Sequence, residues 1–359
     1  MTTHDHAARR DRLRAEIADI GLDAMYVTRP EHLRYLAGFT GSNGQLLVTR
    51  EAGDLLITDQ RYEDRARIET GDMPTDLTRD PSRAALEFVA PGRLGFESDH
   101  VSHRDGLDLI ATAGERSMEV VAVSGLIEQL RLVKDASEVA VIERACAITG
   151  DVMRGLVGHL RPGLTERQIA IHIERDMIDR GADAIAFPSI VASGPNGAVP
   201  HHAPGDRRLE AGDLVTCDIG AMVGGYHADM TRTFALGRPD DRLVNAYDVV
   251  RLAHQAGVDA VAVDVDASAV DHAARSVVDA AGYGSRFVHG TGHGVGLQIH
   301  EAPWVNAQSA DILPARSVIT VEPGIYLPGL GGIRIEDTVL VSADGARCLT
   351  DAPHDLLVL

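Results

Sequence analysis

The second half of the chain passes twice through the same order of elements. Residues 161–183, "RPGLTERQIAIHIERDMIDRGAD", open with Thr165 and Gln168 in capping-box spacing and end near Gly181, which predicts a helix. Residues 265–284, "VDASAVDHAARSVVDAAGYG", begin at an Asp/Ser cap region and also end on glycine. Strand-rich sequence follows each helical stretch, over residues 190–236 and 295–342. We therefore expect two ααβ halves around one antiparallel sheet.

The first part of the chain alternates helical and strand-like patterns. A helix that stops at Gly21 is followed by a strand, and "QLLVT", "DLLIT", "RLGFES" and "MEVVAV" predict further strands. This alternation indicates an α/β domain with a mixed sheet. Residues 124–160 are almost continuously helix-compatible and look like a connecting helix that leads into a second domain. We place the domains at residues 1–128 and 129–359.

Two predicted hairpins each carry a pair of acids in apolar strand sequence. If Met222–Gly225 forms a turn, Asp218 becomes the cross-strand partner of Asp229, eleven positions later. Glu322 and Glu336 are placed symmetrically about Gly329 in the second hairpin. Opposed carboxylates have Cβ atoms about 5 Å apart and repel each other unless a cation lies between them.

The donor types in this pattern suit a metal centre. Four carboxylates, together with an imidazole from "VHGTGHGVGLQIHEAP" (residues 288–303), favour Mn, Co or Zn, because Mg or Ca alone rarely recruits histidine. The count also fits two ions that share bridging carboxylates, an arrangement used in hydrolysis. The zinc-protease motif HExxH is absent, and "GFTGSNG" lacks the flanking pattern of a nucleotide-binding loop.

Charge and cysteine content narrow the partners and the compartment. The chain has 359 residues, with 53 Asp and Glu against 34 Lys and Arg, a formal net charge of −19. This balance argues against nucleic acid or an anionic membrane as the main partner. Cys146, Cys217 and Cys348 form no CxxC pair, which fits a reducing cytosol. No apolar run has the length of a signal-peptide core or a membrane span, so we expect a cytoplasmic protein.

Four segments in this order resemble one family: "DIGAMVGGYHADMTRT", "GTGHGVGLQIHEAP", "VEPGIY" and "RIEDTVL". They are similar to the pita-bread metallopeptidases, which include Xaa-Pro aminopeptidases, Xaa-Pro dipeptidases (prolidases) and methionine aminopeptidases. The preceding domain and "LRLVKDASEVAVIERA" resemble the proline-specific branch, whose N-terminal domain creatinase shares. The resemblance covers essentially the whole chain.

The resemblance implies a ligand set for two divalent ions: Asp218, Asp229, His293, Glu322 and Glu336. In the family, the residues that correspond to Asp229 and Glu336 bridge the two ions. Asp218 then completes one coordination shell, and His293 and Glu322 complete the other. Because creatinase lacks this ligand set and works without metal, the resemblance argues against creatinase-type chemistry. Mn is the metal that we expect, with Co or Zn as alternatives.

The same comparison implies four catalytic residues, His201, His300, Glu322 and Arg334. His201 and His300 are expected to hydrogen-bond the substrate and the developing oxyanion, and Glu322 to shuttle a proton to the leaving nitrogen. His202 alternates to the other face of an extended chain and is the weaker candidate beside His201. For the other histidines considered (His172, His227 and His289) we expect structural roles.

Trp304 decides the expected substrate. Dipeptide-specific prolidases often have an arginine shortly after the "HE" motif, where it binds the substrate's carboxylate, but here the fourth residue after His300 is Trp304. We therefore predict a cytoplasmic Xaa-Pro aminopeptidase for short peptides with proline in second position, with a dipeptidase as the alternative. A non-peptidase hydrolase or lyase, or an inactive binding module, are further alternatives on this fold. The family's habit of dimerising implies a homodimer.

Overall fold

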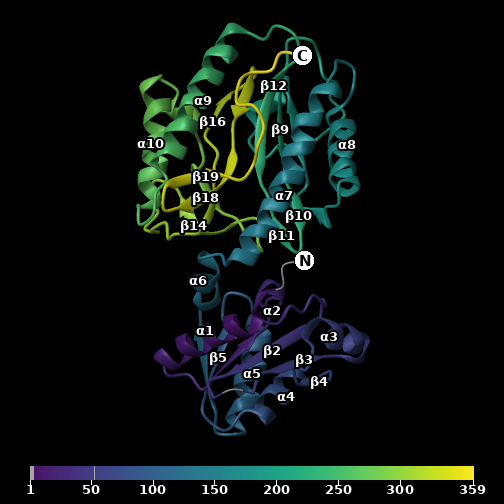
Figure 1. The fold of residues 1–359 in the computed structure, drawn as a ribbon, viewed down its shortest axis with the longest axis vertical. Coiled ribbons are helices and arrows are strands. Elements are labelled where there is room, and N and C mark those ends of the chain that lie inside the picture. The colour runs from purple at the N-terminus through teal and green to yellow at the C-terminus, as the bar shows by residue number, and fades with distance from the viewer. Residues whose placement is uncertain (1–3, 52) are drawn as a thin grey trace. The chain divides into compact units, whose positions relative to one another are not determined.

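A computed structural model describes residues 4–51 and 53–359 of the chain. It divides into two units between Arg131 and Leu132 (Figure 1). None of the helices in the described residues combines the length and the apolar character that a bilayer crossing requires.

The first unit is built on one mixed sheet, as the sequence predicted. Its helices are α1 (His6–Asp19), α2 (Pro30–Ala37), α3 (Glu63–Thr70), α4 (Pro81–Phe88) and α5 (His103–Gly114), with a 3-10 turn η1 (Gln60–Tyr62). Its strands are β1 (Ala24–Val27), β2 (Gly44–Thr49), β3 (Leu55–Thr58), β4 (Thr75–Leu77), β5 (Arg93–Glu97) and β6 (Glu119–Val123), and α6 (Leu126–Leu132) follows. The strand order is β4-β3-β2-β1-β5-β6. The β1–β2 and β2–β3 pairs are antiparallel and the other three pairs are parallel.

The second unit contains two helix pairs, and each packs on the strands of its own half. The first pair is α7 (Ala136–Gly155) and α8 (Glu166–Asp179), and the second is α9 (Asp241–Ala260) and α10 (Ala267–Ala280). The Asp135 and Thr165 side chains close capping boxes that begin α7 and α8. Helices α7 and α8 contact β7 (Ala184–Ile185), β8 (Ile190–Ser193), β10 (Ala221–Val223) and β11 (Tyr226–His227). Helices α9 and α10 contact β14 (Glu301–Val305), β15 (Val318–Val321) and β17 (Gly331–Arg334), on the other side of the unit (Figure 1). The predicted repeat of two ααβ halves is therefore confirmed.

The strands of the second unit pair antiparallel within four separate sheets. They are β7 (Ala184–Ile185), β8 (Ile190–Ser193), β9 (Leu214–Ile219), β10 (Ala221–Val223), β11 (Tyr226–His227), β12 (Met230–Ala235), β13 (Gly292–Gly294), β14 (Glu301–Val305), β15 (Val318–Val321), β16 (Gly324–Leu327), β17 (Gly331–Arg334), β18 (Asp337–Ser342) and β19 (Gly345–Cys348). The sheet orders are β11-β10-β7, β12-β9-β8, β14-β13-β15-β18-β19 and β16-β17. The prediction of one continuous sheet is wrong, because the hydrogen-bonded ladder breaks where the chain places polar residues such as Asp229 and Glu336.

The second hairpin has the predicted register. Gly324 faces Arg334 in the β16–β17 pair, and Val321 faces Asp337 in the β15–β18 pair. Both pairs are symmetric about Gly329, where φ is +76°. Glu322 and Glu336 lie in the gap between these two paired stretches. Since the pairs on both sides of the gap keep the symmetry about Gly329, the predicted position of Glu322 opposite Glu336 agrees with this register.

The first hairpin differs from the prediction by two residues. Its turn is Gly224–Gly225, where φ is positive at both residues, and Val223 pairs with Tyr226. Asp218 therefore faces Thr231 and not Asp229. Because a shift of two residues keeps side chains on the same face of a strand, Asp218 and Asp229 still lie on one face of the hairpin.

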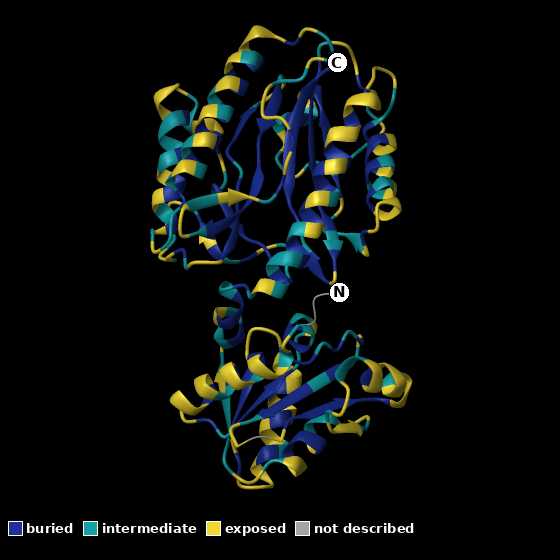
Figure 2. Cartoon of the chain, viewed as in Figure 1, coloured by how far each residue is buried: buried dark blue, intermediate teal, exposed yellow. Residues whose placement is uncertain are grey.

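The strands and the helices of the second unit form two layers that differ in burial. The strands at its centre are buried, while the helices present exposed outer faces (Figure 2). One apolar cluster joins α7 and α8 to β9 and β12, and another joins α9 to β16 and β17. The candidate ligands are thus carried by strands that are held rigidly between packed helices.

Candidate metal centre

The five candidate ligands come from the strand ends of both halves. Asp218 is on β9 and Asp229 lies in the gap between β11 and β12. His293 is on β13, Glu322 follows β15, and Glu336 lies in the gap between β17 and β18. Asp218, Asp229, His293 and Glu336 are buried, and Glu322 is partly buried.

The donor atoms of these residues converge. His293 Nε2 lies 3.6 Å from Asp229 Oδ2 and 3.4 Å from Glu322 Oε1. One donor atom each from Asp229, His293 and Glu336 lie within 4.8 Å of one another. His293 Nδ1 donates to the carbonyl of Gly294 at 3.0 Å, which leaves Nε2 as the lone-pair nitrogen facing the carboxylates.

The electrostatics of the cluster call for a cation. Burial, and then repulsion from Glu336 and Asp218, raise the pKa of Asp229 well above its usual value. Burial and the neighbouring Glu322 and Asp218 do the same to the pKa of Glu336. Among the described residues, no hydrogen-bond donor reaches the buried Oδ1 of Asp218. An orphaned buried carboxylate oxygen and repelling neighbours fit residues that hold divalent ions.

Histidine 293 has the protonation state that a ligand needs. Burial lowers its pKa below the usual value, so the ring is neutral near neutral pH. A neutral imidazole beside carboxylates suits Mn, Co or Zn better than Mg or Ca.

Thr231 and Arg334 hydrogen-bond to the carboxylates of two candidate ligands, Glu336 and Asp218. Thr231 Oγ1 donates to Glu336 Oε2 at 2.6 Å and accepts from Arg334 Nε at 3.1 Å. Arg334 also donates to Asp218 Oδ2 at 2.6 Å and to the hydroxyl of Tyr326 at 2.9 Å. These bonds fix the rotamers of two candidate ligands before any ion binds.

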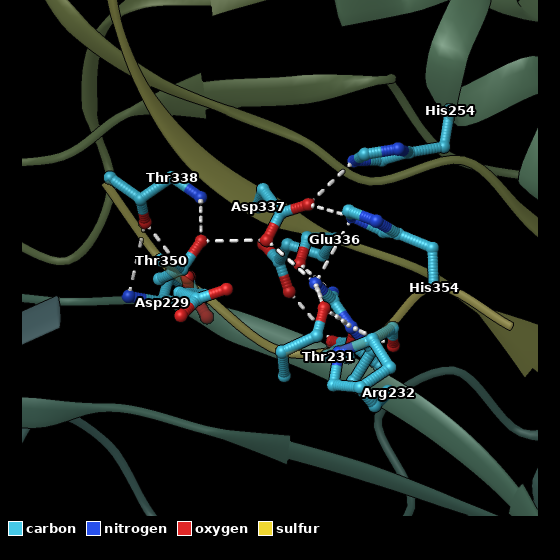
Figure 3. A network of polar contacts seen from close by, with 12 residues as sticks. Asp229, Thr231, Arg232, His254, Glu336, Asp337, Thr338, Thr350 and His354 are labelled. Carbon is cyan, nitrogen blue, oxygen red and sulfur yellow. Dashed lines mark hydrogen bonds and ion pairs between the residues drawn. The ribbon is translucent and has the colours of Figure 1, made fainter. Parts of the chain in front are cut away.

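A second polar network lies beneath Glu336 (Figure 3). Arg232 donates to the carbonyl of Glu336 at 2.6 Å and to Asp337 Oδ1 at 2.9 Å. Asp337 Oδ2 also lies 3.1 Å from His254 Nε2 and accepts from His354 Nε2 at 2.6 Å. Although burial alone raises the pKa of Asp337, Arg232 and the two histidines hold it well below its usual range. Asp337 is thereby kept ionised as the anchor of the strand that follows Glu336.

All eight sequence-predicted site residues line one cavity of about 530 Å³. They are Asp218, Asp229, His293, Glu322 and Glu336 with His201, His300 and Arg334. His300 lies edge-on to His293, with the ring centroids 4.4 Å apart. Burial, followed by the nearby His293, lowers the pKa of His300. The two histidines expected at the substrate thus share one space with the candidate ligands.

The remaining histidines have varied surroundings. His202 Nε2 donates to Glu166 Oε2 at 2.8 Å, and His202 lines the cavity together with His201. His227 Nδ1 lies 3.0 Å from the carbonyl of Gly296, and His172 stacks on His159. His289 lines the cavity, and its Nε2 accepts from the Tyr326 hydroxyl at 2.8 Å.

Several residues of the site were not found from the sequence. Thr231 and Glu166 bond to site residues that lie far away along the chain, and Tyr326 bonds to Arg334, eight positions later. His289 lines the cavity, although only a loop-supporting role was expected for it. Only the placement of Thr231 two residues after Asp229, on the same strand face, gave a usable signal.

Comparison with known proteins places this chain and its fold in a family. Residues 140–343 match the metallopeptidase family M24, and residues 9–133 match the creatinase/prolidase N-terminal domain. An uncharacterized peptidase of Bacillus subtilis is 36% identical, over 97% of this chain and 99% of the relative. The chain belongs to metallopeptidase family M24.

Two solved structures have the same architecture along the whole chain. The Xaa-Pro dipeptidase from Bacillus anthracis superposes with a TM-score of 0.94 at 34% identity, over 99% of this chain and 100% of that one. The X-Pro aminopeptidase from Thermotoga maritima gives a TM-score of 0.89 at 32% identity, over 98% and 99%. The predicted family and fold are confirmed.

Proposed function

We propose that this chain is a two-metal exopeptidase that hydrolyses the bond between an N-terminal residue and proline in short peptides. The convergence of all eight predicted residues on one cavity is the observation that carries the proposal. Relatives named for Xaa-Pro dipeptidase and X-Pro aminopeptidase activity support the substrate class.

The proposed ligands of the ions are Asp218, Asp229, His293, Glu322 and Glu336. By the family resemblance, Asp229 and Glu336 would be shared between the two ions, and the proximity of their donor atoms to that of His293, all within 4.8 Å of one another, supports this assignment. The donor set supports Mn, with Co or Zn as alternatives. Bound ions of this kind lower the pKa of water and polarise the scissile carbonyl.

Side chains of the cavity perform the remaining steps. Burial raises the pKa of Glu322, which suits a group that takes a proton and delivers it to the leaving nitrogen of proline. His201 and His300 hydrogen-bond the substrate and stabilise the developing oxyanion. Arg334 orients the Asp218 carboxylate through their 2.6 Å contact.

The cavity lining favours an aminopeptidase over a strict dipeptidase. Among the described residues that line it, Arg334 is the only arginine or lysine, and its guanidinium is already bonded to Asp218, Tyr326 and Thr231. Trp304, with 46% of its surface exposed, occupies the part of the lining after the "HE" motif. An indole accommodates continuing peptide but cannot pair with a free carboxylate as a guanidinium does. The dipeptidase alternative is favoured by the name of the Bacillus anthracis relative.

A matched pair of substrates distinguishes the two activities. We expect the Mn-loaded chain to cleave Xaa-Pro-Yaa with a higher kcat/KM than Xaa-Pro for the same Xaa. Trp304→Arg is expected to raise the relative rate on the dipeptide by restoring a cation, with the wild-type chain as control. A marked wild-type preference for the dipeptide supports the alternative and contradicts the aminopeptidase assignment.

We further propose that the chain acts as a homodimer in the cytoplasm. The absence of a CxxC pair supports the reducing compartment, and the family resemblance supports the dimer. Sedimentation of the full chain tests the dimer directly, and a single monomeric species contradicts it.

A further inference from the structure

Glu166, the first residue of α8, is a buried carboxylate that gathers five hydrogen bonds. Its exposed fraction is 0%. Oε1 accepts from the amide of Ser193 at 2.8 Å, the Ser193 hydroxyl at 2.7 Å and Asn196 Nδ2 at 2.9 Å. Oε2 accepts from His202 Nε2 at 2.8 Å and the amide of Gly205 at 3.1 Å. Both oxygens are therefore fully engaged by one segment of the chain.

The charge of Glu166 is stabilised where it lies. Although burial alone raises its pKa, the bonds from His202, Asn196 and Ser193 outweigh that effect and hold the pKa below its usual value. The position at the N-terminus of α8 adds a favourable interaction with the helix dipole. A buried carboxylate with this many donors is costly to disturb, because removing it leaves several buried donors without an acceptor.

The five bonds bracket His201 on both sides. Ser193 and Asn196 precede it, at the end of β8 and in η3 (Gly194–Ala198), and His202 and Gly205 follow it. Two backbone bonds tie the same stretch to the start of α8, from Arg167 N to Gly205 O at 3.0 Å and from Glu166 N to Arg207 O at 3.1 Å.

His201 is exposed, and both His201 and His202 line the cavity, where His202 donates to Glu166. Pro200 and His201 lie in a turn, and the five bonds of Glu166 hold the backbone on both sides of that turn. The carboxylate thus holds in place the turn that carries His201.

We propose that Glu166 is a positioning residue that fixes the segment 193–205 and thereby aims His201 into the metal cavity. This inference rests on the proposed function for the role of His201, but the anchoring of the segment can be measured without turnover.

The test compares five forms of the Mn-loaded full-length chain: wild type, Glu166→Gln, Glu166→Ala, His201→Ala and the Glu166→Ala/His201→Ala double variant. Asp179→Asn is the matched control, because Asp179 is on the same helix with 67% of its side chain exposed. Each form is assayed for kcat and KM on one Xaa-Pro-Yaa peptide, for bound Mn, and for hydrogen exchange of residues 193–205. Glu166→Gln keeps the side-chain size, so it tests the charge even if the alanine variant folds poorly.

Positioning predicts a specific pattern of results. Glu166→Ala lowers kcat/KM by about 10- to 100-fold, as expected when a group moves by about 1 Å, while bound Mn stays at the wild-type level. Glu166→Gln loses less, because its amide oxygen still serves Ser193 and Asn196 but its NH₂ group faces the amide of Gly205. Exchange at Gly205 speeds up by at least about tenfold in both variants. In the His201→Ala background, adding Glu166→Ala changes kcat/KM less than about twofold.

Three results overturn the proposal: unchanged exchange over 193–205, wild-type kcat/KM in Glu166→Ala, or losses from Glu166→Ala and His201→Ala that multiply. A wild-type chain that cleaves no Xaa-Pro peptide overturns the proposed function instead. The exchange of residues 193–205 then decides by itself whether Glu166 anchors the segment.

Discussion

Arg334 donates from its guanidinium to Oδ2 of Asp218 across 2.6 Å, and both side chains are buried. The same guanidinium reaches the Tyr326 hydroxyl at 2.9 Å and Thr231 Oγ1 at 3.1 Å. One arginine therefore connects strands β9, β12, β16 and β17 at the cavity floor. Its pKa is raised well above the usual value, because the nearby Tyr326, Asp218 and Glu336 outweigh the effect of burial, so its charge is permanent.

Replacing Arg334 with lysine separates charge from geometry. Arg334→Lys keeps one positive charge but cannot bond three partners at once through a planar fork. We expect kcat to fall by about 10²–10³-fold with a smaller change in KM, as for loss of one preorganised charged group. Steady-state kinetics at saturating Mn measure the change. Equal kinetics for Arg334→Lys and wild type contradict a geometric role.

Thr231 is expected to act through its hydroxyl alone. Thr231→Val keeps the shape and removes the donor to Glu336 Oε2 and the acceptor for Arg334 Nε. The free energy of unfolding should fall by about 1–3 kcal/mol, the cost of leaving buried partners unsatisfied. The affinity for Mn should fall as well, since orienting partners of ligands contribute about 10–100-fold. Denaturant titration and metal-binding isotherms measure the two effects, and Thr231→Ser serves as the control that keeps the hydroxyl.

Metal binding should relieve the repulsion among the ligand carboxylates. Because ions bind only the folded state, Mn at about 100 times its Kd is expected to stabilise the chain by about 2.7 kcal/mol per site. Thermal unfolding with and without Mn measures this as a rise in Tm. Asp229→Asn should abolish most of the rise and lower activity by several orders of magnitude. A Tm that does not respond to Mn, Co or Zn contradicts the proposed metal centre.

Glu166 makes a pH-dependent contribution to the free energy of unfolding. Its pKa in the folded chain lies below the value of 4.5 expected when unfolded. Its ionised form therefore stabilises the fold above about pH 4.5, and this contribution disappears as the pH falls through the folded-state pKa. We expect the difference in unfolding free energy between wild type and Glu166→Gln to be constant from pH 7 to about pH 5 and to shrink in more acid solution. A difference that grows on acidification contradicts the assignment.

Local sequence patterns predicted those features of the fold that depend on residues close together in the sequence. The capping residues of α8 and the symmetry of Glu322 and Glu336 about Gly329 both follow from short-range turn and helix chemistry. The pairing of Asp218 was wrong by two residues, because four consecutive residues offered more than one turn and Gly224–Gly225 has the positive φ values that the turn needs.

Long-range polar partners could not be predicted in this way. Glu166 bonds to residues 27 to 39 positions away, and Thr231 bonds to Glu336 across 105 positions. Such contacts are set by how helices and sheets pack, so a pattern within one segment carries no record of them. The candidate ligands could be named from the sequence because the family resemblance supplied the order in which the ligand motifs follow along the chain.

The most direct test of the account compares a peptide pair that differs only at the second position, Xaa-Pro-Yaa and Xaa-Ala-Yaa, before and after metal removal. We predict that the Mn-loaded chain releases Xaa from the proline peptide much faster than from the alanine peptide. A chelator should abolish both activities, and added Mn should restore them. Unchanged cleavage after metal removal, or no preference for proline, contradicts the assignment of this chain as a metal-dependent Xaa-Pro peptidase.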